Sequence, residues 1–384
     1  MGLELQALGP APFGGMVLGD LGADEIRVDR VDGRGRRVVN PEFDLLGRSH
    51  RSVAVDLTHP DGAETLLSMV EQADVLLEGL RPGVVERLGV GPDECCARNP
   101  RLIYARMTGW GQDGPLAAAA GHDINYIALA GALHTVGRRG DGQVPPVNLV
   151  GDFGGGGMLL AVGVLAALVE RATSSQGQVI DAAMVDGAAL LTTSLHGWRA
   201  SGQWHDERGT NAVDSGSHYY DTYETADGRH ISIGPVERPF YAELLERLGL
   251  AGEELPEQYD RASWPAMKDR FAAIFRQRSR AEWCDLLEGT DVCFAPVLSL
   301  AEAPGHEHNR HRGVFCEVGG ITQPAPAPRF SRTGVATPTP APLPGSHTTE
   351  VLRELGLPSD RIAGLAQRGV IHQRAGDHDA RHPR

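Results

Sequence analysis

The sequence has almost no lysine. Lys268 is the only lysine among the 36 Lys and Arg residues of the 384-residue chain. Schiff-base enzymes need a reactive lysine, and phosphate-binding loops of the GK[ST] type need one at a fixed place. Because a single lysine, in the segment AMKDR, leaves almost no room for either arrangement, we set both enzyme classes aside.

Cysteine is also scarce. The five cysteines include the adjacent pair Cys95 and Cys96, and they show neither CxxC spacing nor a disulfide framework. The start MGLELQALGPAPFGG lacks the charged and apolar regions of a signal peptide. The longest apolar stretch, 158–169, is too short to cross a bilayer. We therefore expect a soluble cytoplasmic protein in a reducing compartment, without a membrane partner.

Positive charge is in deficit overall. Asp and Glu number 50 against 36 Lys and Arg, which gives a net charge of -14. Such a field repels nucleic acid and anionic membrane surfaces, so we expect no nucleic-acid partner. A polyanionic ligand must instead be met by a local cluster of arginines.

What the chain does have is enough apolar residues, 41%, for a sizeable core, and a regular alternation of patterns. Helical and extended patterns alternate over residues 16–106, which indicates a parallel sheet covered by helices on both faces. A second cycle follows. Residues 155–171 are apolar on nearly every side and predict a buried helix, and 178–184 predict a fully buried strand.

Beyond residue 201 the pattern changes to short strands and amphipathic helices. We predict a large α/β domain over 1–200, completed by 320–366, and a small α+β domain over 210–300. The proline-rich composition predicts a linker over 300–345. The polar, Arg- and His-rich end predicts a disordered tail over 367–384.

Three groups can carry chemistry. His122 and Asp123, in GHDINY, stand at a predicted helix start; Asp152 precedes four glycines; and Glu237, in GPVER, ends a predicted strand. One histidine and two carboxylates suffice for proton transfer at carbon. Each also has a structural alternative: a satisfied histidine, a helix-capping aspartate and a solvated surface glutamate. The glycine run lacks the GxGxxG spacing of dinucleotide sites.

Several motifs together resemble the family III CoA-transferase superfamily, most closely its racemase branch, the α-methylacyl-CoA racemases. They keep the family's order and spacing along nearly the whole chain. In chain order they are PAPFGGMVLGDLGADEIRVDR, RSVAVDL, NPRLIYARMTGWGQDGP, GHDINYIALAG, VNLVGDFGGGG, GQVIDAAMVDG and TADG followed by IGPVE.

The resemblance implies an epimerase that moves a proton at the α-carbon of (R)- and (S)-2-methylacyl-CoA thioesters through an enolate. It assigns the two proton carriers to His122 and Asp152, with Glu237 hydrogen-bonded to His122. The backbone N–H of Asp123 is expected to stabilise the enolate oxygen, and Asn148 to support the loop of Asp152.

The resemblance also implies where CoA binds, as part of the substrate and without a metal or redox cofactor. Phosphates are assigned to Arg34 and Arg87, with Arg51 and Arg106 as weaker candidates. Tyr126 belongs to the same site. The adenine is assigned to the strand residues Val53, Ala54 and Asp56.

The family fold combines a large, Rossmann-like parallel-sheet domain, built from both chain ends, with a smaller domain, and two chains interlock as a homodimer. Two departures stand out. The chain begins several residues short of its relatives, so we expect either a truncated first strand or a start that is not the native one. Polar residues, Ser215, Ser217 and His218, replace a Gly-Gly-Ala-Pro segment expected to line the acyl side of the pocket, and His218 is either a pocket residue or a solvated loop residue.

Two other functions remain open. A CoA-transferase would use the Asp152 carboxylate as a nucleophile and become acylated. A non-catalytic acyl-CoA-binding protein would have lost a catalytic position. The sequence favours the racemase, because a transferase has no use for a second proton carrier at His122.

Overall fold

The computed structural model describes residues 1–32 and 41–374, in two compact units. The first unit comprises Met1–Ala130, Val147–Leu191 and the segment from Gly313 onward, and the second comprises Gly131–Pro146 and Thr192–Arg312. The first unit thus ends at Leu191 before the long segment of the second unit, earlier than the predicted boundary at residue 200.

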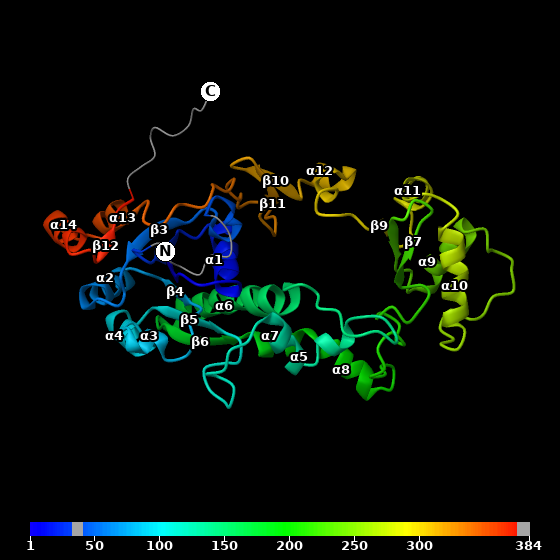
Figure 1. Ribbon diagram of the computed structural model, residues 1–384, viewed down its shortest axis with the longest axis horizontal. Coiled ribbons are helices and arrows are strands. Elements are labelled where there is room, and N and C mark those ends of the chain that lie inside the picture. The colour runs from blue at the N-terminus through cyan, green and yellow to red at the C-terminus, as the bar shows by residue number, and fades with distance from the viewer. Residues whose placement is uncertain (33–40, 375–384) are drawn as a thin grey trace, which may run out of the picture. The chain divides into compact units, whose positions relative to one another are not determined.

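A seven-stranded sheet forms the middle of the first unit (Figure 1). Its order is β12-β3-β2-β1-β4-β5-β6, and only β12 runs antiparallel to its neighbour. The first strand is short but central, because it pairs with both β2 and β4. The strands are β1 (Gly2–Leu5), β2 (Glu25–Asp29), β3 (Arg51–Val55), β4 (Val75–Glu78), β5 (Ile103–Thr108), β6 (Gln178–Ala183) and β12 (Ile371–His372).

Helices cover both faces of this sheet, as the alternating patterns predicted. One core cluster joins the sheet to α2, α4, α13 and α14, and the other joins it to α1 and α6. The helices of this unit are α1 (Pro10–Asp20), α2 (Pro60–Val70), α3 (Val84–Arg87), α4 (Pro92–Arg98), α5 (Asp123–Leu129), the π-helix η4 (Leu149–Met158), α6 (Leu159–Ser174), α7 (Met184–Leu191), α13 (Thr348–Glu354) and α14 (Ser359–Gln367).

The second unit is an α+β body, as expected from the short strands in its sequence. An antiparallel sheet of order β7-β8-β9 packs with an aromatic-rich core that includes Phe271 and Trp283. Its elements are α8 (Thr193–Ala200), β7 (Asp221–Glu224), β8 (His230–Ile233), α9 (Arg238–Arg247), α10 (Trp264–Phe275), α11 (Arg280–Leu287), β9 (Phe294–Pro296) and α12 (Glu307–Arg312).

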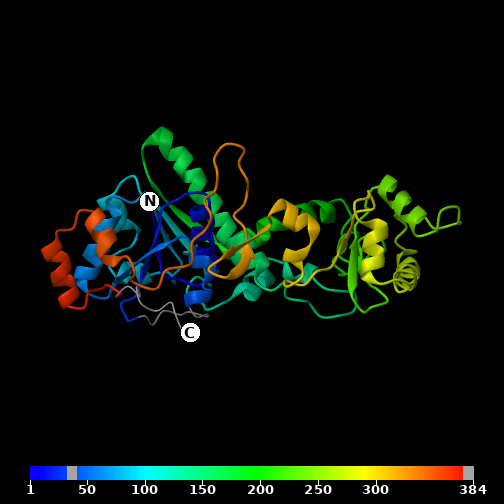
Figure 2. The ribbon, with the colours of Figure 1, turned by 90° about the horizontal axis from the view of Figure 1, so that it is seen from above.

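The C-terminal part is more ordered than predicted. The expected linker over 300–345 contains α12 and the hairpin of β10 (Phe315–Val318) and β11 (Ile321–Pro324). The predicted start of the tail at residue 367 is too early. Val370 and Ile371 are buried, and Ile371 begins β12, which pairs with β3. The red C-terminal helices therefore lie beside the blue N-terminal strands (Figure 2). Residues 375–384 lie outside the described part.

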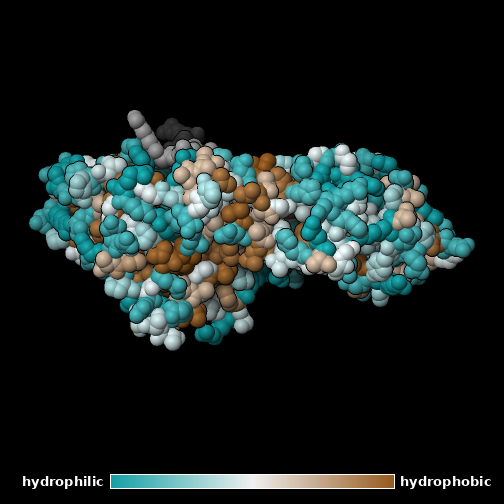
Figure 3. All heavy atoms as spheres, turned by 90° about the horizontal axis from the view of Figure 1, so that it is seen from below, coloured by the Kyte–Doolittle hydropathy of each residue, from teal (hydrophilic) through white to brown (hydrophobic). Residues whose placement is uncertain are grey.

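Two elements predicted as fully buried are half exposed. Strand β6 is the edge of the sheet, and its first residues face solvent. Helix α6 leaves Val162 54% and Val169 74% exposed. Figure 3 shows apolar side chains gathered on one face of the molecule. We call the exposed large apolar residues of η4, α6, β6 and α7 the α6 face; they are Leu149, Met158, Val162, Leu165, Val169, Val179, Leu190 and Leu191.

Helices η4 and α6 form one uninterrupted run of 26 residues, Leu149–Ser174. By length and composition this run could cross a membrane, so the expectation that the longest apolar segment is too short was wrong. Core helices of soluble proteins satisfy the same criterion.

Candidate functional site

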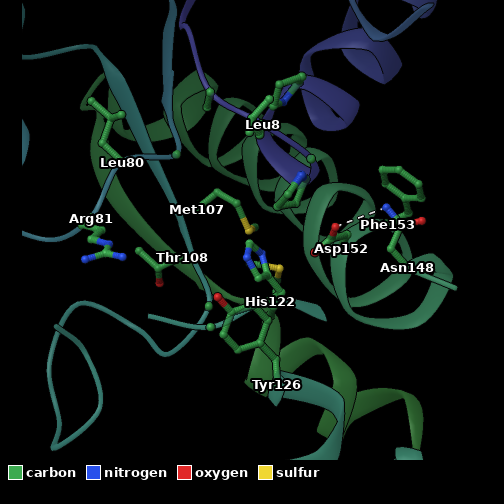
Figure 4. Close-up of a pocket in the computed structure, with 18 of the residues that line it drawn as sticks. Leu8, Leu80, Arg81, Met107, Thr108, His122, Tyr126, Asn148, Asp152 and Phe153 are labelled. Carbon is green, nitrogen blue, oxygen red and sulfur yellow. Dashed lines mark hydrogen bonds between the residues drawn. The ribbon is translucent and has the colours of Figure 1, made fainter. Parts of the chain in front are cut away.

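A cavity of about 720 Å³ opens in the first unit at the carboxyl ends of β1, β4 and β5. The chain builds β2 and β3 on one side of β1, and then returns to place β4 on its other side. Such a reversal of strand order is where open α/β sheets bind ligands. Leu8, Leu80 and Thr108, which follow or end these strands, line the cavity (Figure 4).

Asp152 reaches this cavity from η4. Close packing explains the glycines that follow it: a Cβ at Gly155 would lie 2.6 Å from the backbone nitrogen of Ala188, and one at Gly157 would lie 2.4 Å from the carbonyl oxygen of Pro10. Only glycine allows this approach without displacing the neighbouring backbone. Asn148, not Asp152, occupies the N-cap position of η4, so the helix-cap interpretation of Asp152 was wrong.

The surroundings of the Asp152 carboxyl favour its protonated form. Burial raises its pKa, a hydrogen bond from Asn148 Nδ2 to Asp152 Oδ2 (3.3 Å) lowers it, the charge of Asp123 raises it, and His122 lowers it; the net pKa is raised. The predicted support by Asn148 is therefore confirmed as a direct contact. A raised pKa makes a carboxyl group a better candidate for both giving and taking a proton.

His122 lies at the N-cap position of α5, where the sequence predicted a helix start, and its side chain also lines the cavity (Figure 4). Its backbone N–H donates to Asn125 Oδ1 (3.0 Å). The imidazole and the Asp152 carboxyl thus enter one cavity from two different helices. This arrangement brings two side chains that are able to carry a proton to one cavity.

Tyr126, one turn along α5, closes the side of the cavity next to His122. Its ring packs edge-on against Trp110, with ring centroids 4.7 Å apart. A Cβ at Gly109 would lie 2.1 Å from this ring, and one at Gly121 would lie 2.7 Å from it. The two glycines therefore make room for the aromatic wall, and the assignment of Tyr126 to CoA binding stays a prediction.

Comparison with known proteins decides the family. A family model described as CoA-transferase family III matches residues 3–348. The chain belongs to this family. It is 46% identical over 371 residues to mouse alpha-methylacyl-CoA racemase and 42% identical over 372 residues to the human one, with 96% of each chain covered in both cases. It is also 27% identical to human succinyl-CoA:glutarate CoA-transferase, over 97% of this chain and 89% of that protein.

A solved structure shares the fold. The crystal structure of a CAIB/BAIF family protein from Brucella suis superimposes with a TM-score of 0.80 at 25% identity, covering 92% of this chain and 97% of that one. The mixed α/β architecture with a mainly parallel sheet is therefore that of the family.

Some residues that the family resemblance assigned to CoA do not line the cavity. Val53 and Ala54 are buried in β3, between β2 and β12. Asp56 holds a turn by accepting from the backbone and hydroxyl of Thr58. Arg87 is exposed at the end of α3. These residues were assigned to CoA by their position in the family motifs, and a position in a motif does not say which end of a strand faces a cavity.

The weaker arginine candidates have structural partners. Arg106 is buried between Glu78 and Glu86, with Nε and Nη2 each 2.8 Å from a carboxylate oxygen. Arg51 pairs with Asp24 and Glu354. Charges committed in this way are not available to a ligand. Arg34 lies outside the described residues.

Arg81 is a cavity residue that none of the sequence motifs singled out. It is exposed and lines the cavity just after β4, and its guanidinium has no hydrogen-bond or ion-pair partner among the described residues (Figure 4). The signal was present: RPG directly follows the strand DVLLEGL. An arginine at the carboxyl end of a parallel strand stands where an anionic ligand binds.

Two predictions concern the second unit. Glu237 is exposed at the N-cap of α9, not at the end of a strand, and its hydrogen bond to His122 stays a prediction. Ser217 and His218 are buried, and His218 Nε2 lies 2.7 Å from the hydroxyl oxygen of Tyr241. His218 is therefore a core residue, neither in a solvated loop nor at a pocket surface; only Ser215 of the polar segment lines a small cavity.

Proposed function

We propose that this protein is an isomerase that interconverts (R)- and (S)-2-methylacyl-CoA thioesters. The observation that carries the proposal is the entry of His122 and Asp152 into one cavity of a chain that is 46% identical to a racemase of these substrates. The relative's name supplies the substrate class, and the geometry supplies the pair of proton carriers.

The reaction needs two proton transfers at one carbon. One carrier takes the α-proton while the electron pair of the broken C–H bond moves into the thioester carbonyl, which becomes an enolate. The other carrier then gives its proton to the opposite face of the planar α-carbon, and the carbonyl forms again. Reversal exchanges the roles of His122 and Asp152, so either epimer is a substrate.

The enolate oxygen requires a donor. Among the described residues no acceptor takes the backbone N–H of Asp123, as is usual in the first turn of a helix. This N–H follows directly after the proton carrier His122 and is the donor that we propose. Arg81 at the cavity mouth is the cation that we propose for a CoA phosphate.

We include a homodimer in the proposal. The α6 face exposes large apolar side chains on neighbouring elements, which single soluble chains rarely do. A second copy covering this face would remove it from water. In such a dimer we expect Glu237 of the partner subunit to orient His122.

The dimer predicts a native mass of twice the 41.0 kDa chain in sedimentation equilibrium. Replacing Val162 and Val169 together by glutamate is expected to shift the protein to monomer and to lower its activity. Glu170→Gln, on the same helix, is the matched control and should change neither. A wild-type monomer, or wild-type protein that floats with lipid vesicles instead of self-associating, would contradict this proposal.

Isotope exchange tests the reaction itself. A single epimer of 2-methylacyl-CoA in deuterated water should gain deuterium at the α-carbon and lose stereochemical purity, measured by NMR. A second reaction contains a free carboxylic acid as acceptor. Transfer of CoA to that acid without exchange would support the transferase alternative. If neither exchange nor transfer occurred, only the binding-protein alternative would remain.

A further inference from the structure

Asp123 connects the two elements that carry the proton carriers. Its backbone follows His122 at the start of α5, and its side-chain Oδ2 accepts a hydrogen bond from the backbone N–H of Asp152 in η4 (2.7 Å). The residue is only 5% exposed. One buried side chain therefore links the residue after His122 to the backbone of Asp152.

The local sequence is fitted to this carboxylate. A Cβ at Gly151 would lie 2.5 Å from Asp123 Oδ2 and 2.9 Å from its Cγ, so the glycine makes room for the side chain. The other oxygen, Asp123 Oδ1, is buried and has no hydrogen-bond partner among the described residues. A buried carboxylate oxygen without a partner is unusual, and it leaves negative charge uncompensated beside Asp152.

We propose that the Asp123 side chain is a positioning residue: its carboxylate holds the backbone of Asp152 in place, and its charge favours the protonated form of the Asp152 carboxyl. This inference rests on the proposed function, because it concerns the proton carrier of that reaction. Like charges in one buried site disfavour a second ionisation. The raised pKa of Asp152 agrees with this, since burial is its first cause and the charge of Asp123 is one of the others.

The groups around Asp152 are few. From α5 it faces His122, Asp123 and Tyr126. The α1 and α7 atoms nearest to the glycines of η4 belong to residues without a titratable side chain: Pro10, Phe13, Gly14, Met184, Gly187, Ala188 and Leu191. The loop after β1 contributes Gly9, whose Cβ position is 3.3 Å from Asp152 Oδ2. Asp123 is thus the acidic group among these neighbours.

Two substitutions of Asp123 separate the effect of its hydrogen bond to the Asp152 backbone from the effect of its charge. Asp123→Asn keeps an oxygen acceptor for the Asp152 N–H and removes the charge. We expect its kcat to stay within about tenfold of wild type, while the acid limb of the kcat/KM profile moves to lower pH. Asp123→Ala also removes the acceptor, and a lost buried hydrogen bond to a charged group predicts an about tenfold to hundredfold fall in kcat. Asp260→Asn, an exposed carboxylate that accepts from the Ala262 N–H (3.2 Å), is the control and should change neither quantity.

A second measurement does not depend on turnover. Carbon-13 NMR of protein labelled at the Asp side-chain carboxyl follows the titration of Asp152, which is assigned by its loss in Asp152→Asn. The Asp152 signal should titrate at lower pH in Asp123→Asn than in wild type. An unchanged or higher midpoint overturns the inference even if the enzyme is a racemase. A lower midpoint in a protein that exchanges no α-proton would keep the electrostatic role and reject the reaction.

Discussion

Replacing His122 or Asp152 by a residue that cannot carry a proton is expected to lower the rate of epimerisation by about 10²- to 10⁴-fold, the range for loss of a general acid or base. Each variant should still fold, because His122 is exposed and Asp152 is half buried at a cavity wall. Circular dichroism and chiral chromatography of the product measure the two properties.

The two-carrier arrangement makes a sharper prediction for the single variants. Each carrier deprotonates the epimer whose α-proton points toward it. Asp152→Asn should therefore still exchange the α-proton of the epimer that His122 deprotonates, although it inverts neither. His122→Asn should show the opposite preference. These partial reactions are measured by deuterium uptake from each pure epimer.

The control for these variants is His308→Ala, which removes an exposed histidine of α12 and should leave epimerisation unchanged. If the Asp152→Asn protein lost exchange of both epimers equally, a single carrier would serve both faces. An active double variant without either side chain would remove both residues from the mechanism altogether.

The second large effect concerns stability and pH. Glu25 lies buried in β2 with Glu4 and His50 beside it. Burial is the main cause that raises the pKa of Glu25 from 4.5 to about 7. The charge of His50 lowers this pKa, and the charge of Glu4 raises it. Between these values the folded protein holds a proton that the unfolded chain has released. The contribution of Glu25 to the free energy of unfolding is therefore greatest below pH 4.5. It falls by about 3 kcal/mol as the pH rises from there through 7.

The same cluster holds a second proton. His50 Nδ1 donates to the carbonyl oxygen of Arg48 (2.8 Å), and Nε2 faces Glu4 Oε2 (3.4 Å). Burial lowers the pKa of His50, but the hydrogen bond and charge of Glu4 outweigh it and leave the pKa raised. The contribution of His50 to the stability of the fold therefore also decreases as pH rises. A variant of Glu25 is needed to separate the two contributions.

Glu25→Gln mimics the protonated side chain at every pH. We expect it to exceed wild type by about 3 kcal/mol in the free energy of unfolding at pH 8, and to differ by less than about 1 kcal/mol at pH 5. Urea unfolding at fixed protein concentration measures both values. Asp24→Asn, at an exposed neighbour of Glu25 paired with Arg51, should change stability by less than about 1 kcal/mol at either pH. If Glu25→Gln and wild type differed by the same free energy of unfolding at pH 5 and at pH 8, the raised pKa of Glu25 would be contradicted.

The alternation of helical and extended patterns along residues 16–106 predicted β2, β4 and β5 as strands of a parallel sheet, and all three are buried on both faces, the charged residues of β2 (EIRVD) included. The same argument failed for β6 and α6. Their apolar residues are exposed in a single chain, and a pattern cannot distinguish burial within a chain from burial against another surface.

The sequence by itself determined the family, through motifs that place His122, Asp152 and the glycines after it in a fixed order. Those glycines and the helix start at His122 are local, so a local signal finds them. Only the tertiary structure decided which residues share the cavity: it admits Arg81 and keeps Val53 and Ala54 inside the sheet. It also decided that Asp123 contacts Asp152, because that contact joins residues 29 positions apart and depends on how η4 packs against α5.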